Sequence, residues 1–207
     1  MHFEKINNTG QAQLFKNSFL ESLTKTRPWI IYSIYIPLCA FLLFYSYSEL
    51  GFSAAFISGL FFISMLSWTL CEYIAHRYLF HYEATSKLGL RIVYIFHGNH
   101  HEYPRDKQRL FMPPVPSMIA AFLLFSLFFG LSYLLTGTGN YAFICFPGFV
   151  TGYLIYVSRH YAIHAFPPPN LHHYKYPEKG FGVSSVIWDV VFRTIPKKDG
   201  SENQQTK

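Results

Sequence analysis

The chain has 207 residues, of which 51% are hydrophobic, 20% are aromatic and only 14% are charged. This composition exceeds what the core of a water-soluble domain needs and is typical of an integral membrane protein. The net charge of +6 would suit a nucleic-acid ligand. However, the basic residues are scattered beside apolar segments, so we expect an anionic lipid surface as the partner and no nucleic acid.

Residues 1–28 form the first predicted region, an N-terminal arm on the cytoplasmic side. The arm has no apolar run before Arg27, which does not fit a cleaved signal peptide. Leu14, Phe19 and Leu23 follow an approximate helical spacing. This spacing is compatible with a helix on the bilayer surface and also with a plain solvated arm.

Four membrane-spanning helices are predicted, arranged as two hairpins. Residues 29–47 and 50–71 carry no charge and form the first hairpin, with Ser48 and Gly51 in its turn. The second hairpin lies within residues 110–158, which contain no Asp, Glu, Lys or Arg. Its arms are separated by the turn at 136–140, and the second arm, from about 141 to 158, should kink near Pro147.

Three cysteines stand alone in or beside these apolar runs, without a CxxC pair, and are predicted to be packing residues: Cys39, Cys71 and Cys145.

The distribution of basic residues predicts the orientation of the spans. All 17 Lys and Arg residues lie in the N-terminal arm, in residues 76–109, or from Arg159 onward, and the two hairpin turns contain none. By the positive-inside rule, both hairpins enter from the cytoplasm and return to it. The expected fold is therefore all-α, with a membrane domain over residues 29–194, a cytoplasmic helical cap, and a disordered tail over residues 195–207.

Nine of the ten histidines fall into four clusters at the cytoplasmic ends of the predicted spans. They are His76 and His81, then His97, His100 and His101, then His160 and His164, and then His172 and His173. Because all clusters emerge on one face, they can meet at one site. A structural zinc ion takes four ligands and normally includes cysteine, so nine imidazoles suit two metal ions better than one. A polyhistidine site for two metals is predicted.

The spacing within the clusters indicates how the imidazoles could be shared. His160 and His164 are four residues apart and project from one face of a helix. The second cluster and the adjacent pair His172 and His173 hold diverging side chains, which suits bridging between two metals. His76 and His81 are five apart, about 140° on a regular helix, so they must straddle the site or need a local distortion.

The chemistry expected at a membrane face favours iron over zinc. Imidazole binds zinc, copper, iron and nickel, so the ligand type does not decide. Zinc could only polarise a group or activate water, whereas iron activates oxygen and can attack an unactivated C–H bond. The histidines begin where the apolar runs end, so a C–H bond near the polar end of a lipid would be within reach.

Four stretches surround the histidine clusters: HRYLFHYE from His76, HGNHHEYPRDKQRLFMPP from His97, GYLIYVSRHYAIH ending at His164, and LHHYKYPEKGFGVSSVIWDVVF from Leu171. On these stretches, residues 72–194 resemble the fatty acid hydroxylase and sterol desaturase superfamily, and most closely its fatty acid 2-hydroxylase branch. The resemblance implies a four-helix membrane enzyme that uses O2 and supplied electrons to hydroxylate a fatty acyl or ceramide-type lipid beside the carbonyl.

The resemblance also implies the residues and the cofactors. All nine clustered histidines become metal ligands, with His100, His101 and His173 as catalytic residues, and the metals are two iron ions, with zinc as a possible occupant. Only 28 residues precede the first span and they contain no haem or flavin motif, so we expect a separate electron-transfer protein. The site would face the cytoplasm, from the endoplasmic reticulum of a eukaryote or the inner membrane of a bacterium.

The chain departs from the family pattern at the last motif. A His-x-x-His-His sequence is usual there, but Pro169 stands three residues before His172. Asn170, a water molecule or a substrate oxygen could fill the gap, or the second metal could bind weakly. A catalytically inactive, metal-binding homologue is therefore one alternative, and a sterol or carotenoid oxygenase of the same superfamily is another.

Two further sequence features bear on the site. Four carboxylates lie beside the histidines and are candidates to orient the imidazoles: Glu72, Glu102, Asp106 and Asp189. For Glu102 and Asp106 the alternative is an ion pair at the surface with Arg105, Lys107 or Arg109. The predicted spans lack ionisable residues near their midpoints and the histidines lie outside them, which argues against a transporter and a membrane cytochrome.

Overall fold

The structure is a computed structural model that describes residues 7, 9–82, 84–165 and 179–196. Four of its helices are long and apolar enough to span a membrane. They are α2 (Pro28–Ser48), α3 (Ala54–Ile74), α6 (Pro114–Thr136) and α7 (Ala142–Ala165). The described residues contain helices and loops and no strand. The all-α fold with two membrane-spanning hairpins is therefore confirmed.

Two of the long helices, α3 and α7, extend beyond the uncharged stretches from which they were predicted. The span of α3 continues to Phe80 through a π-helix, η1 (Ala75–Phe80). Helix α7 continues through Pro147 and ends at Ala165, seven residues beyond the predicted end of the fourth span. The α7 extension carries both His160 and His164, whereas η1 carries His76 and ends one residue before His81, which is its C-cap.

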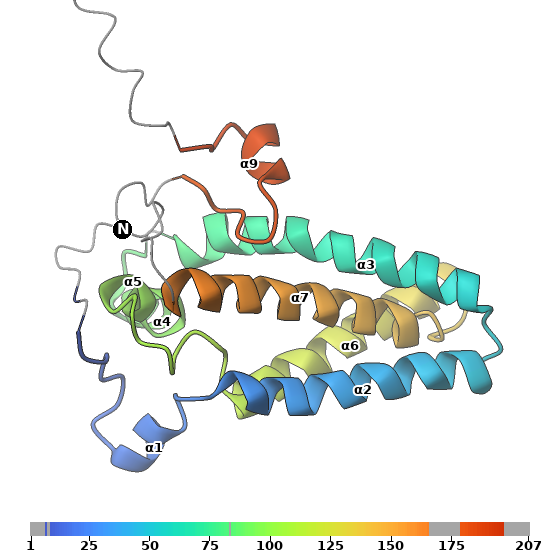
Figure 1. The fold of residues 1–207 in the computed structure, drawn as a ribbon, viewed down its shortest axis with the longest axis horizontal. Helices are drawn as coiled ribbons and strands as arrows, with labels where there is room; N and C mark the ends of the chain where they lie inside the picture. The colour runs from blue at the N-terminus through green and yellow to red at the C-terminus, as the bar shows by residue number, and fades with distance from the viewer. Residues whose placement is uncertain (1–6, 8, 83, 166–178, 197–207) are drawn as a thin grey trace, which may run out of the picture.

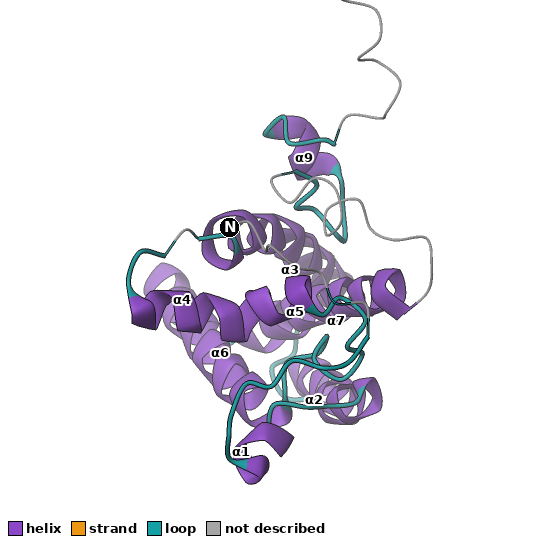
Figure 2. Ribbon diagram, turned by 90° about the vertical axis from the view of Figure 1, so that its left-hand side faces the viewer, coloured by secondary structure: helices purple, strands orange, loops and turns teal. Residues whose placement is uncertain are grey.

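Helix α7 is the central helix of the bundle. In the most apolar stretch of α7, 56% of the residues are buried, against 6% in the corresponding stretches of α3 and α6 and 28% in that of α2. Figures 1 and 2 show α7 lying among the other three long helices. The exposed apolar side chains of α3 and α6, such as Ile63 and Leu134, then face the lipid.

Two glycines of α7 allow this helix to lie close against α3. A Cβ atom added at Gly148 would come within 2.4 Å of the Phe61 carbonyl oxygen, and one at Gly152 within 2.5 Å of the Trp68 Cβ. Small residues four apart let two membrane helices approach at backbone distance. The α3–α7 contact depends on this pair.

The two hairpin turns lie at the end of the bundle opposite the histidines. Gly51, in the first turn, has a φ of +71°, and the Ser53 side chain caps α3 by accepting a hydrogen bond from the Phe56 N–H. Gly137 closes the end of α6 in the left-handed region, with a φ of +74°. The first turn carries Glu49, and neither turn carries a basic residue.

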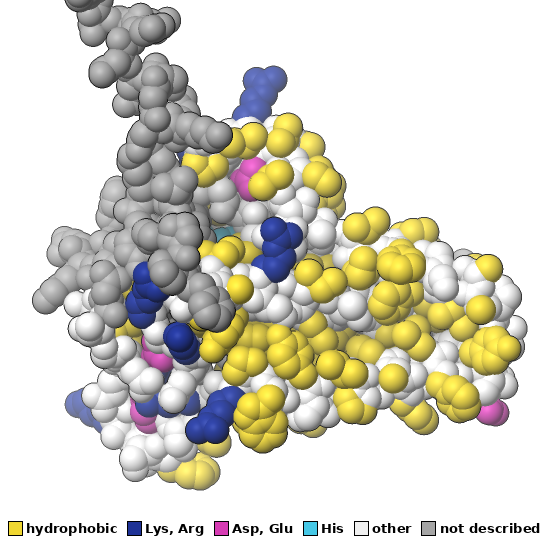
Figure 3. Space-filling model, viewed as in Figure 1, with side chains coloured by type: hydrophobic (Ala, Val, Ile, Leu, Met, Phe, Trp, Pro, Cys, Tyr) yellow, Lys and Arg dark blue, Asp and Glu magenta, His cyan; other side chains and the backbone are white. Residues whose placement is uncertain are grey.

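The other end of the bundle is covered by a cap of short helices (Figure 1). They are α1 (Ser18–Ser22), α4 (Lys87–Val93), the π-helix η2 (Tyr94–Gly98) and α5 (Asn99–Glu102), while another short helix, α9 (Ile187–Val191), lies beside α3 near this end. On the face drawn in Figure 3, most of the basic and acidic side chains lie toward this end, while the spans are largely apolar. We call this the capped end.

The N-terminal arm packs against the cap through a buried charged network. The Arg109 guanidinium contacts the carboxylates of Glu21 and Asp106, and its side chain is 3% exposed. Arg91 donates a 2.9 Å hydrogen bond to the Leu14 carbonyl, and the Leu14 side chain is buried. The helical spacing noted over this arm corresponds to a helix of only five residues, α1.

Candidate metal centre

The first histidine motif begins on the π-helix that ends the second span, with His76 in η1 and His81 as its C-cap residue. Hydrogen bonds in a π-helix join residues five apart, and the His81 N–H donates to the His76 carbonyl at 3.2 Å. This bond places His81 over His76 on one side of the helix, with ring centroids 5.2 Å apart. The local distortion that a five-residue spacing requires is therefore this π-helix.

The second motif lies on another π-helix followed by one short α-helical turn. His97 belongs to η2, and His100 and His101 belong to α5. The buried Asn99 side chain holds this junction together, because its amide donates to the carbonyls of Tyr94 at 3.0 Å and Ile95 at 2.8 Å. Both motifs thus use five-residue hydrogen bonding, a feature that recurs at functional sites.

Three imidazoles from these two motifs converge. His76, His81 and His101 each offer a ring nitrogen, and these atoms lie within 4.8 Å of one another. Two imidazoles bound to one ion at about 2.0–2.1 Å lie at most about 4.2 Å apart, so small side-chain rotations would close the site. The donors are borderline-soft nitrogens without thiolate or carboxylate, which fits a transition metal or zinc and not calcium or magnesium.

The third motif lies on the central helix. His160 and His164 are buried on α7, with ring centroids 4.7 Å apart and planes at 30°. The side chain of Arg105, which follows α5, donates to the His164 carbonyl at 3.3 Å. This contact joins the end of α7 to the loop after the second motif, so the third pair lies at the capped end with the other two.

The remaining predicted ligands cannot be placed from the described part of the chain. The backbones of His97 and His100 are described, but their side chains are not. His172 and His173 lie in residues 166–178, outside the described ranges, as do Pro169 and Asn170 at the departure from the family pattern. The full set of nine ligands, and the catalytic roles of His100, His101 and His173, therefore stay predictions.

A segment after the third motif orients His76. The Nδ1 atom of His76 lies 2.7 Å from the Phe181 carbonyl oxygen, and a carbonyl can only accept. Metal-bound imidazoles are commonly oriented by this kind of bond through the second nitrogen. Sequence reasoning did not find Phe181, because every residue carries a backbone carbonyl and nothing in the side chain marks this one.

Two of the predicted carboxylates hold this segment by its backbone. Asp189 accepts hydrogen bonds from the N–H groups of Phe181 at 3.0 Å and Gly182 at 2.9 Å. Glu72 accepts from those of Val183 at 2.6 Å and Ser184 at 2.9 Å. Four consecutive N–H groups are thus bound by two buried carboxylates, and the carbonyl of Phe181 is turned toward His76.

The other two carboxylates act elsewhere in the cap. Glu102 accepts a 2.7 Å hydrogen bond from the Tyr94 hydroxyl, and burial together with this carboxylate raises the pKa of Tyr94. Asp106 binds Arg109 at 2.6 Å and the Gln108 N–H at 3.2 Å. These contacts brace the second motif and the N-terminal arm.

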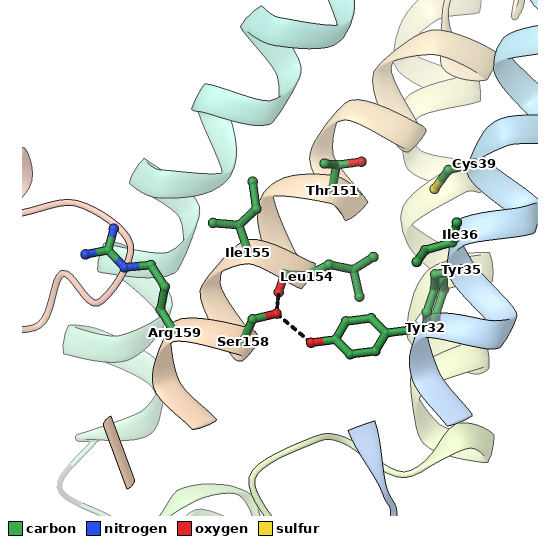
Figure 4. Close-up of a pocket in the computed structure, with 9 residues that line it drawn as sticks. All are labelled: Tyr32, Tyr35, Ile36, Cys39, Thr151, Leu154, Ile155, Ser158 and Arg159. Atoms are coloured by element: carbon green, nitrogen blue, oxygen red, sulfur yellow. Dashed lines mark hydrogen bonds between the residues drawn. The ribbon is translucent and has the colours of Figure 1, made fainter. Parts of the chain in front are cut away.

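A groove of about 440 Å³ lies between α2 and α7 within the membrane spans (Figure 4). Its walls include Ile36, Cys39 and Leu154, and at one side the Tyr32 hydroxyl bonds Ser158 at 2.7 Å. Ser158 and His160 are two residues apart, about 200° around a helix. The groove and the histidines therefore occupy different faces of α7.

These features define a multi-pass membrane protein with a histidine-rich metal site at one end of its spans. The family model for fatty acid hydroxylases matches residues 61–194. The chain belongs to the fatty acid hydroxylase family, as the resemblance predicted.

Similar proteins come from plants and fungi. The chain is 32% identical to the dihydroceramide fatty acyl 2-hydroxylase FAH1 of Arabidopsis thaliana, over 93% of this chain and 84% of that protein. It is 34% identical to the ceramide very long chain fatty acid hydroxylase SCS7 of Saccharomyces cerevisiae, over 94% of this chain and 52% of that protein. A solved structure of full-length scs7p, with only the hydroxylase domain visible, superposes with a TM-score of 0.79 at 33% identity, covering 92% of this chain and 74% of that one.

Proposed function

We propose that the protein is a membrane lipid hydroxylase that places a hydroxyl group on carbon 2 of a fatty acyl chain, beside the carbonyl. The convergence of His76, His81 and His101 at the capped end is the observation that carries the proposal. The family and the names of the relatives support this reaction class. Free fatty acid, acyl thioester and ceramide-type lipids share the acyl carbonyl and are all candidate substrates.

The reaction consumes one O2 and two electrons for each C–H bond. One oxygen atom enters the C–H bond as a hydroxyl, and the other leaves as water after taking up two protons. Two bound iron ions would supply the oxygen activation that imidazole side chains cannot. The electrons come from a separate electron-transfer protein that docks on the cytoplasmic face of the cap.

The chain itself provides binding and orientation. His76, His81 and His101 would hold metal together with His97, His100, His160, His164, His172 and His173. The backbone carbonyl of Phe181 accepts a hydrogen bond from Nδ1 of His76 and so keeps the ring proton on that nitrogen. Nε2 is then the nitrogen that would bind an ion. Because the histidines lie at the end of the spans, the acyl carbon they reach is near the lipid headgroup.

The first experiment measures metal content and product on the same sample. Protein purified without oxygen is analysed for metals, then given reductant, O2 and palmitic acid or a ceramide, and the lipids are examined by mass spectrometry. We expect about two iron ions per chain and a product heavier by one oxygen, with fragments that place the hydroxyl at carbon 2. One metal or none, without product, would identify an inactive homologue and implicate the Pro169 position.

Variants link the product to the histidines. His100→Ala and His101→Ala should abolish product formation and lower bound metal while the protein keeps its elution volume and helical content. Full hydroxylation with reduced metal in either variant would contradict the assignment. Oxygenation of a sterol or carotenoid, with both acyl substrates left unchanged, would favour the other branch of the superfamily.

A further inference from the structure

Helix α9 lies beside the second span and not beyond its end. The Trp188 indole donates a 2.9 Å hydrogen bond to the Thr69 hydroxyl on α3. The Phe192 ring stacks on Tyr73 with centroids 5.0 Å apart, and the Tyr73 hydroxyl bonds Thr194 at 2.8 Å. In Figure 1, α9 flanks the part of α3 nearest the capped end. The helix is thus attached to the outer side of the bundle.

The side chains around Thr69 indicate the depth of α9. Thr69 belongs to the membrane span Ala54–Phe80. Leu66 lies further from the capped end than Thr69 and is 61% exposed, and Ile74 lies closer to that end and is 46% exposed. Lipid must cover both, and Ile74 lies about 7.5 Å closer to the capped end than Thr69 at 1.5 Å per residue. Trp188, which binds Thr69, therefore lies at a depth within the bilayer.

The outer face of α9 has the composition that this depth requires. Val186, Ile187, Val190 and Val191 are 57–67% exposed and follow the i, i+1, i+4, i+5 spacing of one helical face. Asp189 projects to the opposite side and is 2% exposed. Figure 3 shows apolar side chains over this element. An apolar face of this kind marks an interaction site, and beside lipid-facing spans its partner is the bilayer.

We propose that α9 lies within the lipid leaflet at the capped end without crossing the bilayer. The four apolar side chains of its outer face then contact the acyl chains. This inference goes beyond the proposed hydroxylation and needs only that the four spans lie in a bilayer. Its consequence concerns the metal site. Asp189, on the inner face of α9, binds the backbone of Phe181 and Gly182, so a helix seated in lipid holds the segment that orients His76.

The test compares the surroundings of single labelled positions in lipid nanodiscs. Ile187→Cys is labelled with bimane in a background where Cys39, Cys71 and Cys145 are alanine. Ile63→Cys is the matched lipid-facing control, since Ile63 and Ile187 are 67% and 61% exposed. Lys107→Cys, on the exposed surface of the cap, is the aqueous control. Each label is titrated with iodide in water and with doxyl-labelled phosphatidylcholine in the bilayer.

We expect the label at position 187 to be quenched by the doxyl lipid, as at position 63, and to have a Stern–Volmer constant for iodide several-fold below that at position 107. Iodide quenching equal to that at position 107 would place α9 in water and overturn the proposal. Quenching by neither agent would show that protein covers this face, and would overturn it as well.

A second measurement keeps the native cysteines, in case the cysteine-free chain does not fold. Trp29→Phe and Trp68→Phe leave Trp188 as the only tryptophan. In nanodiscs of brominated phosphatidylcholine its emission should fall well below that in unbrominated lipid. Equal emission in the two lipids would contradict a position within the leaflet.

Discussion

The Nδ1 atom of His76 donates a hydrogen bond to the Phe181 carbonyl oxygen, 2.7 Å away and 105 residues later in the chain. The bond selects one tautomer and leaves Nε2 as the nitrogen that can bind a metal. Phe181 is held in turn by Asp189, and its neighbours are held by Glu72. The orientation of a candidate ligand therefore depends on two carboxylates that do not belong to its own motif.

The two carboxylates should respond differently to amide substitution. Each oxygen of Asp189 accepts from a backbone N–H, so the NH2 group of Asp189→Asn must face a donor. In Glu72→Gln one oxygen still serves Val183 and Ser184, and the new NH2 group meets the Ser184 hydroxyl, which can accept. We expect Asp189→Asn to weaken metal binding about tenfold, and Glu72→Gln much less. Chelator competition measures both, and equal affinities would refute this role of Asp189.

Asn99 should be required for the second histidine motif. Its amide donates to two backbone carbonyls, and in Asn99→Asp a carboxylate of nearly the same shape would repel both. Leaving such buried groups unpaired costs about 1–3 kcal/mol each. We expect lower bound metal and a lower unfolding temperature, measured by elemental analysis and thermal unfolding in detergent. Asn140→Asp, near the turn between α6 and α7, is the control and should keep its metal.

The glycines of α7 should be intolerant of a single methyl group. Gly148→Ala and Gly152→Ala would each meet α3 at 2.4–2.5 Å, so the helices must separate. Overpacking of this kind costs about 1–3 kcal/mol, which lowers the unfolding temperature. Gly59→Ala on α3 meets nothing within 4 Å. This control should be neutral or slightly stabilising because alanine favours the helix, and a matching loss there would show that the α3–α7 contact is not the cause.

The attachment of the N-terminal arm should depend on pH through Glu21. Partial burial acts to raise the pKa of Glu21, but the Phe15 and Leu14 N–H groups and the Arg109 guanidinium outweigh it and lower the pKa. Because this pKa is lowered, ionised Glu21 stabilises the attachment of the arm at pH values above the ordinary carboxyl pKa of about 4. The stabilisation is lost as the pH falls through the lowered pKa of Glu21.

Hydrogen exchange of the backbone amides of Leu14 and Phe15 measures this attachment. We expect slow exchange at neutral pH and, after correction for the intrinsic rate, a loss of protection in strong acid. Asp106 and Lys25 also face this network. In Glu21→Gln the protection at neutral pH should be weaker, and the part of its pH dependence that belongs to Glu21 should disappear. An unchanged pH profile in that variant would refute the assignment of this effect to Glu21.

The spans and the histidine clusters could be predicted because both depend on short stretches of sequence. A run without charge between residues 29 and 47 must cross or enter hydrocarbon whatever the rest of the chain does. The spacing of His160 and His164 predicts one helical face, and α7 carries both as expected. The spacing of His76 and His81 indicated only that regular helix would not serve. The π-helix that resolves it ends a span packed on α7, against a segment more than 100 residues later.

The membrane class, the two hairpins, the family and the histidines available for metal could all be predicted, because they follow from local hydrophobicity and side-chain chemistry. The folded arrangement was needed to find which imidazoles meet, that Phe181 orients His76, that Glu72 and Asp189 bind backbone N–H groups, and that α9 lies beside α3. Those relations join residues far apart in the chain through backbone groups that every residue carries, so only the folded arrangement distinguishes them.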